Sequence, residues 1–281
     1  MENPSEECRA LLQQAEVYAE QQDHYHAVKL CKRAIRLSPG WLPPYLCLSQ
    51  IYLKRREWKA VVHYNKKVVA LDPSRQGNWW NLGLGAAATG RFRLARRVWR
   101  KFGLTDRRSF QKKPVVVQLQ HSGMYELVWA QPLDPVRVAL ESIPHPASDR
   151  CYRDVVLIGR EQVGTTVAGQ HRLPVFAELD LLKRSHFQTW SCLLEEATSS
   201  DIQTLEELCR NAQLGMEIWS NANRSMRIPQ QSEYHAQNWW SEDDETAFVA
   251  IAGRQEKPIR EVLRSWSVIT LKQWHDLKRH N

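Results

Sequence analysis

The 281-residue sequence predicts an α+β protein in two parts: a helical repeat array, followed by a mostly antiparallel, sheet-rich half. Three observations predict this fold class. A proline-ended segment recurs with a period of 34 residues. The composition becomes rich in β-branched residues after Pro114, which favours strands. The last third of the chain follows the order strand, helix, strand twice, separated by a long polar loop.

The repeat is visible in two proline-ended segments. Ala-Ile-Arg-Leu-Ser-Pro ends at Pro39, and Val-Val-Ala-Leu-Asp-Pro ends at Pro73, 34 residues later. Each copy holds two segments with the apolar spacing of an amphipathic helix, joined by a polar turn. A third copy lacks the proline and ends at Phe102-Gly103 instead. One helical hairpin cannot bury its apolar face alone, so we expect three hairpins that stack. Small residues recur where paired helices must approach closely, namely Ala15, Ser49, Gly83, Ala27, Ala60 and Ala95.

The third copy resembles a known family. It has Trp79, Leu82 and Gly83 at the spacing W-x2-L-G, and Ala95 and Trp99 at the spacing A-x3-aromatic. In these residues the chain is similar to the tetratricopeptide repeat (TPR) family, over about residues 8–103. The resemblance implies a helical solenoid whose first helices line a concave groove that binds partners. The residues at groove positions are Arg9, Gln13, Glu16, Leu46, Cys47, Gln50, Lys54, Trp80, Asn81 and Leu84.

These groove positions mix polar and apolar side chains, which suits an extended peptide or a helix. One branch of the family clamps the C-terminal carboxylate of a chaperone tail with Lys, Asn and Arg side chains. Arg9 and Asn81 fit that pattern, but Gln13, Cys47 and Gly77 stand at the other places, so the resemblance disfavours this ligand. A groove filled by another part of the same chain is the alternative.

Positive charge is concentrated in one segment. The net charge is +8, and residues 91–113 alone supply +9, with ten basic residues and one acid, Asp106. A helix starting near Arg91 would bury Trp99 on one side and place a basic surface on the other. That surface consists of Arg93, Arg96, Arg97, Arg100 and Lys101. It is compatible with a solvated helix face, with docking onto an acidic surface, or with contacts to nucleic-acid phosphates. Phe92 is the main aromatic candidate for stacking on bases, since Trp99 is needed for packing.

Composition divides the chain into four predicted parts. They are a TPR-like domain over 1–105, a basic linker over 106–114, a small antiparallel β domain over 115–187, and a ferredoxin-like α+β domain over 188–281 with a polar loop at 220–245. We expect β-domain strands over 115–120, 126–131, 136–142, 154–158 and 162–167, with a turn at 159–161. In the last part we expect strands over 190–196, 216–219, 246–252 and 268–271 and helices over 201–212 and 258–266. That order is typical of a split βαβ unit, although 272–279 fits a helix equally well.

The polar loop contains Trp239 and Trp240, directly before an acidic run. Because tryptophan dominates binding hot spots, this pair is a candidate anchor for a partner. Packing of the pair on the sheet, with the acids solvated, is the alternative.

Catalytic motifs are absent from the sequence. It has no GxSxG, no P-loop, no GxGxxG after a strand and no HExxH. The six cysteines form no CxxC pair and have no histidine at metal-ligand spacing, so we expect reduced thiols and neither metal nor cofactor. His145 and Cys151 are close in sequence, which is weak support for a catalytic pair.

The sequence also bears on location and role. It has no apolar stretch that could span a membrane, and its first residues lack the features of a secretory signal. We therefore expect a non-enzymatic cytoplasmic adaptor or scaffold with a protein or peptide partner. A nucleic-acid-binding protein that uses residues 91–113 is the first alternative. An enzyme with an unrecognised site in the second half is another.

Overall fold

A computed structural model gives the fold, and it describes residues 4–104, 114–121, 124–168, 171–220, 225–227, 233–235 and 246–280. The chain separates into two compact units, residues 1–111 and residues 112–281. The predicted basic linker lies outside the described residues, apart from Pro114.

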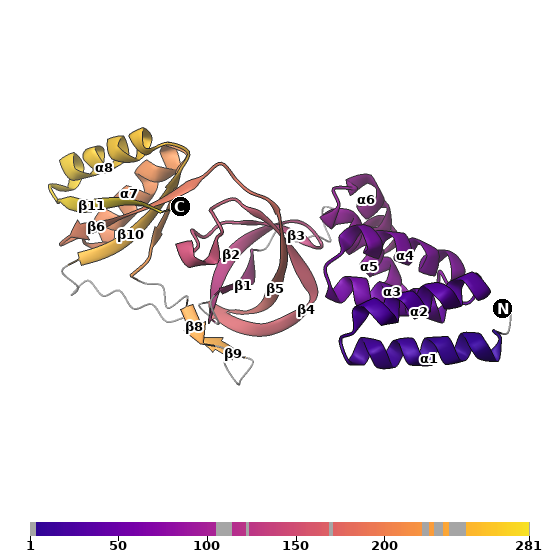
Figure 1. Cartoon of the computed structure of the whole chain (residues 1–281). Helices are drawn as coiled ribbons and strands as arrows, with labels where there is room; N and C mark the ends of the chain where they lie inside the picture. Colours follow the sequence, from indigo (N-terminus) through magenta and orange to yellow (C-terminus); the bar gives the residue numbers. More distant parts are fainter. Residues whose placement is uncertain are drawn as a thin grey trace. The chain divides into compact units, whose positions relative to one another are not determined.

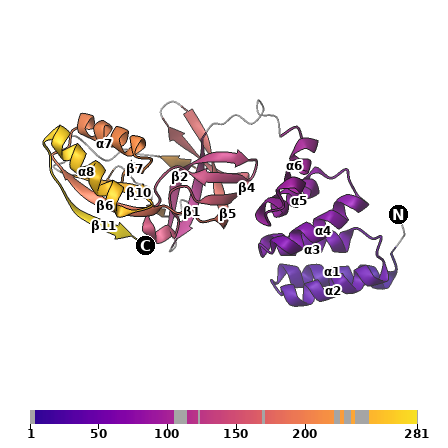
Figure 2. The ribbon, with the colours of Figure 1, turned by 90° about the horizontal axis from the view of Figure 1, so that it is seen from above.

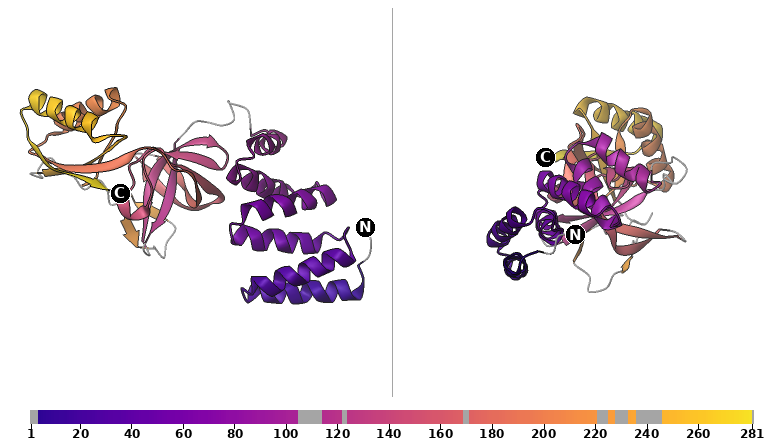
Figure 3. Two further views of the ribbon diagram at one scale, coloured as in Figure 1. Left: turned by 45° about the horizontal axis from the view of Figure 1, so that its top comes forward. Right: turned by 90° about the vertical axis from the view of Figure 1, so that its right-hand side faces the viewer.

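The described part of the N-terminal unit consists of antiparallel helical hairpins that stack along the chain (Figures 1 and 3). The helices are α1 (Glu6–Glu20), α2 (His24–Leu37), α3 (Pro43–Lys54), α4 (Trp58–Leu71), α5 (Gln76–Ala88) and α6 (Phe92–Lys101). Side chains and prolines fix several helix starts. Ser5 caps α1 by accepting a hydrogen bond from the Cys8 N–H, Asp23 caps α2 in the same way, and Pro43 occupies the first turn of α3. The three predicted hairpins are confirmed.

Small residues allow these helices to pack closely. Ala15, Ser49, Ala27 and Ala95 are all buried, as their recurrence in the sequence predicted. A central cluster joins the first two hairpins, with Leu12, Ala15, Cys31, Leu48, Tyr52 and Val61 as its buried members. Neighbouring hairpins therefore share one core, as expected of a stacked repeat.

The C-terminal unit begins with a closed, mostly antiparallel sheet. Its strands are β1 (Val115–His121), β2 (Met124–Asp134), β3 (Arg137–Leu140), β4 (Val155–Ala168) and β5 (His171–Lys183), with a 3-10 turn η1 (Pro146–Ser148). Consecutive strands pair antiparallel, and β1 also pairs parallel with β5, which closes the ring. Its interior is apolar, formed mainly by Val117, Leu119, Val128, Ala130, Val138, Leu140, Val156 and Ile158.

The predicted turn at 159–161 is wrong. Residues 155–158 and 162–167 belong to one strand, β4, because β5 pairs with it on both sides of residues 159–161. The residues that indicated a turn lie instead in a stretch where β4 pairs irregularly with β5, with register shifts between Leu157 and Gly164. The sequence pattern missed β5 itself, since Pro174 in its middle argues against a strand.

Two short strands lie within the predicted polar loop. β8 (Ser225–Arg227) pairs antiparallel with β2, and β9 (Glu233–His235) pairs parallel with β4. The loop thus contributes strands to the closed sheet. Trp239 and Trp240, the candidate anchors, lie outside the described residues.

The second sheet has split βαβ topology. Its elements are β6 (Gln188–Glu195), α7 (Ser199–Asn211), β7 (Gly215–Ile218), β10 (Thr246–Gly253), α8 (Glu256–Thr270) and β11 (Trp274–His280). The strand order is β11-β6-β10-β7, so β10 lies between the two strands that α7 connects. The helices α7 and α8 lie together on one face of the sheet (Figure 2).

The end of the chain differs from expectation. The predicted strand over 268–271 is wrong, because Val268 and Ile269 belong to α8 and are exposed. Leu271 ends the helix in the left-handed conformation, and the last strand is β11. Two β-branched residues on the outer face of an anchored helix do not change its conformation, because the buried face determines it.

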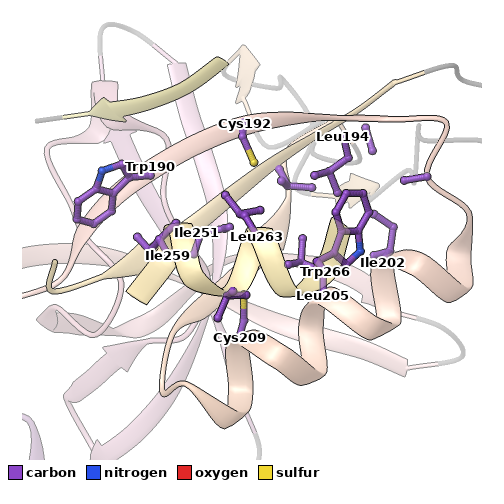
Figure 4. Packing of buried hydrophobic residues seen from close by; sticks show 14 residues of the cluster. Trp190, Cys192, Leu194, Ile202, Leu205, Cys209, Ile251, Ile259, Leu263 and Trp266 are labelled. Carbon is purple, nitrogen blue, oxygen red and sulfur yellow. The ribbon is translucent and has the colours of Figure 1, made fainter. Parts of the chain in front are cut away.

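The two faces of this sheet have different partners. The helix face packs around Trp190, Ile251, Leu263 and Trp266, among other residues (Figure 4). On the opposite face, Ala250 and Ala252 pack with Ile143, which lies in the connection between β3 and β4 of the closed sheet. The Ile143 N–H donates to Glu217 Oε2 at 2.6 Å, and Trp219 Nε1–H donates to the Ile143 carbonyl at 3.1 Å. These bonds join the two sheets within one unit.

Candidate functional site: a pocket in the helical array

A pocket of about 460 Å³ opens between α1, the start of α2 and α3. Its size is within the range of ligand pockets in proteins. The lining is mostly apolar, with a few polar groups. The lining residues are Glu16, Ala19, Glu20, His24, Pro43, Leu46, Cys47, Gln50, Ile51 and Lys54. Both α1 and α3 are first helices of their hairpins, so this pocket lies where the resemblance places a groove.

Charged groups stand at the edge of the pocket. Glu16 and Glu20 lie four residues apart on α1, so both carboxylates project from the same side of that helix. Lys54 ends α3. None of these three side chains forms an ion pair within the described part of the chain. The pocket therefore offers two carboxylates and one ammonium to a ligand.

One further polar atom faces this region without a partner. His24 Nδ1 is buried and makes no hydrogen bond among the described residues. A buried imidazole nitrogen without a partner costs free energy, and a ligand group could satisfy it.

Two thiols meet at the pocket wall. Cys47 lines the pocket and is partly exposed, whereas Cys31 on α2 is fully buried behind it. The Cys31 thiol donates a hydrogen bond to the Cys47 sulfur, which lowers the pKa of Cys47 against the opposing effects of burial and Glu16. The same hydrogen bond, together with burial, raises the pKa of Cys31. Sequence reasoning missed this pair, because the two cysteines lie 16 residues apart on different helices.

The structure brings together only part of the groove set derived from the resemblance. Glu16, Leu46, Cys47, Gln50 and Lys54 line the pocket. The remaining positions do not, namely Arg9, Gln13, Trp80, Asn81 and Leu84.

Those remaining positions have different surroundings. Arg9 and Gln13 are exposed on α1. Trp80 packs on Trp99, with ring centroids 5.0 Å apart, and Leu84 is buried. Their role in binding stays a prediction.

The basic surface of α6 is exposed. Arg93, Arg96, Arg97, Arg100 and Lys101 all face solvent. Within the described residues none of them forms an ion pair, whereas arginines elsewhere do. Lys101 alone has an aromatic contact, its Nζ lying 3.8 Å from the Trp79 ring centroid. Uncompensated cations spaced along one helix form a surface suited to an anionic partner.

The candidate catalytic pair in the second half is not supported. His145 Nδ1 accepts a hydrogen bond from the Ala147 N–H at 3.3 Å, and its ring packs near Trp219. Burial raises the pKa of the Cys151 thiol, and Asp154 adds to this effect. A thiol with a raised pKa is a poor nucleophile.

A different histidine in this unit has a hydroxyl partner. His280 Nε2 lies 2.7 Å from Ser191 Oγ, on the sheet face that packs against Ile143. Burial lowers the pKa of His280, and the charges of Lys278 and His145 lower it further. Ser191 is buried, so we assign this pair a structural role. Among the described residues, no group of three or more histidine, cysteine, aspartate or glutamate side chains is arranged to hold a metal ion.

The helix spacing identifies the N-terminal region. The second helices of the hairpins begin at His24, Trp58 and Phe92, each 34 residues after the one before. Residues 6–101 form an array of helical hairpins of the TPR type, with the 34-residue period of that repeat. None of the array's helices, and no other described helix, is long and apolar enough to cross a bilayer.

Solved TPR domains are similar to the N-terminal third of the chain. No family model matches the chain, and no curated protein does. The Sgt2 TPR domain from Aspergillus fumigatus is similar with a TM-score of 0.31 and 16% identity, over 35% of this chain and 65% of that one. The first TPR domain of Spaghetti (RPAP3), bound to the HSP90 peptide SRMEEVD, has a TM-score of 0.32 and 14% identity, over 34% of this chain and 77% of that one. The second TPR domain of Spaghetti, bound to the same peptide, has a TM-score of 0.32 and 13% identity, over 36% of this chain and 94% of that one.

Proposed function

We propose that the TPR array binds a peptide segment of a partner protein in the pocket between α1, α2 and α3. The observation that carries this proposal is the pocket itself, with its apolar lining and uncompensated charges at the edge. Apolar lining favours burial of one or two apolar side chains, and the polar groups fix their orientation. In this role the chain is a non-enzymatic adaptor or scaffold of the cytoplasm.

The charges at the edge indicate which peptide would bind. Glu16 and Glu20 together favour a ligand with Lys or Arg beside its apolar anchor, because a cation there would meet two carboxylates. An acidic ligand would be repelled by the same groups. The chaperone-tail peptide SRMEEVD, bound by the Spaghetti domains, therefore serves as an acidic probe that should bind poorly.

The test uses the full chain and fluorescence anisotropy with labelled peptides. An apolar peptide flanked by lysines, the same peptide flanked by glutamates, and SRMEEVD are compared at equal ionic strength. We expect binding of the lysine-flanked peptide and loss of at least about tenfold in affinity for Glu16→Gln combined with Glu20→Gln. Glu6→Gln, on the same helix but outside the pocket, is the matched control and should leave the affinity unchanged. Equal or tighter binding of the acidic peptides would refute the proposed ligand chemistry.

A second candidate function rests on the exposed cations of α6. Nucleic acid would neutralise them, and such binding falls steeply as salt rises. Anisotropy with labelled single-stranded RNA across a salt series tests this alternative. Arg93→Gln, Arg97→Gln and Arg100→Gln together should weaken binding and flatten its salt dependence. Lys59→Gln, Lys66→Gln and Lys67→Gln on α4 remove the same charge elsewhere and should change the affinity less. Equal losses in both triple variants would mean non-specific attraction to a basic chain.

A further inference from the structure

The Cys31–Cys47 pair is a different feature from the peptide-binding chemistry of the pocket. Four other cysteines are present, all free thiols. Of these, Cys8, Cys192 and Cys209 are buried, so solvent does not reach them. Cys47 combines partial exposure, a pocket that admits small molecules, and packing against the core cluster that contains a second thiol, Cys31. No other pair in the described chain has all three properties.

We propose that Cys47 is an oxidation site in the pocket wall, and that Cys31 converts its oxidised form into a disulfide that links α2 to α3. The oxidant is a hydroperoxide, the simplest being hydrogen peroxide. The inference stands on the exposure of Cys47 at the pocket and on its packing against the cluster that contains Cys31, and it does not require the pocket to bind a peptide.

The first step takes place at Cys47. Its thiolate attacks one peroxide oxygen, the O–O bond breaks, and hydroxide leaves with the electron pair of that bond. Sulfur is oxidised by two electrons and the peroxide is reduced by two. The product is a sulfenic acid at Cys47. The lowered pKa of Cys47 increases the thiolate fraction available for this step.

The second step uses the buried neighbour. The Cys31 sulfur attacks the Cys47 sulfenic sulfur, the S–O bond breaks, and the Cys31 proton leaves with the hydroxyl group as water. The helices α2 and α3 pack directly against each other, so the bond forms between adjacent elements of one core cluster.

The chain contains its own negative control. Cys192 on β6 and Cys209 on α7 also share one core cluster (Figure 4). Burial raises the pKa of each to about 12, and neither lies at the pocket. Both pairs therefore pack in one core cluster each, while exposure and acidity differ. If proximity alone sufficed, both pairs would oxidise.

The experiment treats the reduced full-length protein with one equivalent of hydrogen peroxide, blocks free thiols with a maleimide, and maps peptides by mass spectrometry. We expect one cross-linked peptide pair containing Cys31 and Cys47, lighter by the mass of two hydrogens, with Cys192 and Cys209 fully blocked after denaturation. In Cys31→Ser, the sulfenic acid at Cys47 should persist and react with a dimedone-type probe. In Cys47→Ser, oxidation of Cys31 should disappear.

A second measurement does not depend on peroxide. The alkylation rate of Cys47 by iodoacetamide is followed against pH in the native chain and two variants. Cys31→Ser retains a hydroxyl donor and should keep the native profile, whereas Cys31→Ala should shift it to higher pH and slow the reaction severalfold at neutral pH. Oxidation of Cys151 before Cys47, or absence of the Cys31–Cys47 link in native protein, would overturn the proposal. Identical pH profiles in all three chains would overturn the role of Cys31.

Discussion

Gly83 lies directly beneath the indole of Trp99. A Cβ placed on Gly83 would lie 2.7 and 2.9 Å from Cζ3 and Cζ2 of that ring, closer than carbon atoms pack. Position 83 therefore requires a glycine, because the Trp99 ring on the next helix leaves no space for a Cβ atom. This pair positions α5 against α6, the helix that carries the basic surface.

Gly83→Ala is expected to destabilise the N-terminal unit. Trp99 is buried and has no space to move into, so overpacking should cost about 1–3 kcal/mol, reduced by the better helix propensity of alanine. Chemical denaturation measures this change in the free energy of unfolding. Gly77→Ala in the same helix has nothing within 4 Å of its new Cβ and should be neutral or stabilising. Equal effects at both positions would contradict the contact.

Asn65→Asp tests a buried polar contact between α3 and α4, the two helices of the second hairpin. Asn65 is fully buried, and its Nδ2 donates to Ser49 Oγ at 2.7 Å and to the Val61 carbonyl at 2.9 Å. A carboxylate there would be desolvated and would face acceptors, so we expect a loss of roughly 3 kcal/mol at neutral pH. Its pKa should be raised in the folded state, so the deficit should shrink as the pH falls. Denaturant melts at several pH values measure both effects, and a deficit independent of pH would disprove the explanation.

Glu217→Leu should weaken the contact between the two sheets of the C-terminal unit. It removes the acceptor of the Ile143 N–H, and loss of such a partly buried bond costs about 1–3 kcal/mol. Thermal melting followed by tryptophan fluorescence measures the loss. Glu207→Leu, on the exposed side of α7, makes the same chemical change without a buried bond and should have little effect.

The stability of the C-terminal unit should decrease as the pH falls below about 6.5. The folded-state pKa of His280 is lowered, so folding favours its neutral form. The contribution of neutral His280 to the free energy of unfolding is present above its unfolded-state pKa. It is lost as the pH falls through its folded-state pKa. His280→Gln should therefore reduce the change in melting temperature between pH 7.5 and 5.5. His186→Gln, an exposed control, should retain the full change, and an equal response of both variants would exclude His280 as the cause.

Local signals made much of the fold predictable. The period between Pro39 and Pro73 and the small residues such as Ala15 indicated stacked hairpins, because helix packing constrains each repeat in the same way. The order of elements after Gln188 indicated the split βαβ sheet. Strand pairing was not predictable where the partner strand contains a residue that is unusual in strands, as β5 does with Pro174. The division between residues 187 and 188 into separate domains stays a prediction.

By itself, the sequence determined the repeat, the basic helix face and the absence of known catalytic motifs, since these depend on residue type and spacing along the chain. Only the tertiary structure decided which predicted groove residues share a pocket. It also packed Cys47 against the core cluster that contains Cys31, and it brought the Ile143 N–H within hydrogen-bond distance of Glu217. These contacts join residues on different elements, and no local pattern encodes them, because packing of one element on another sets which side chains meet.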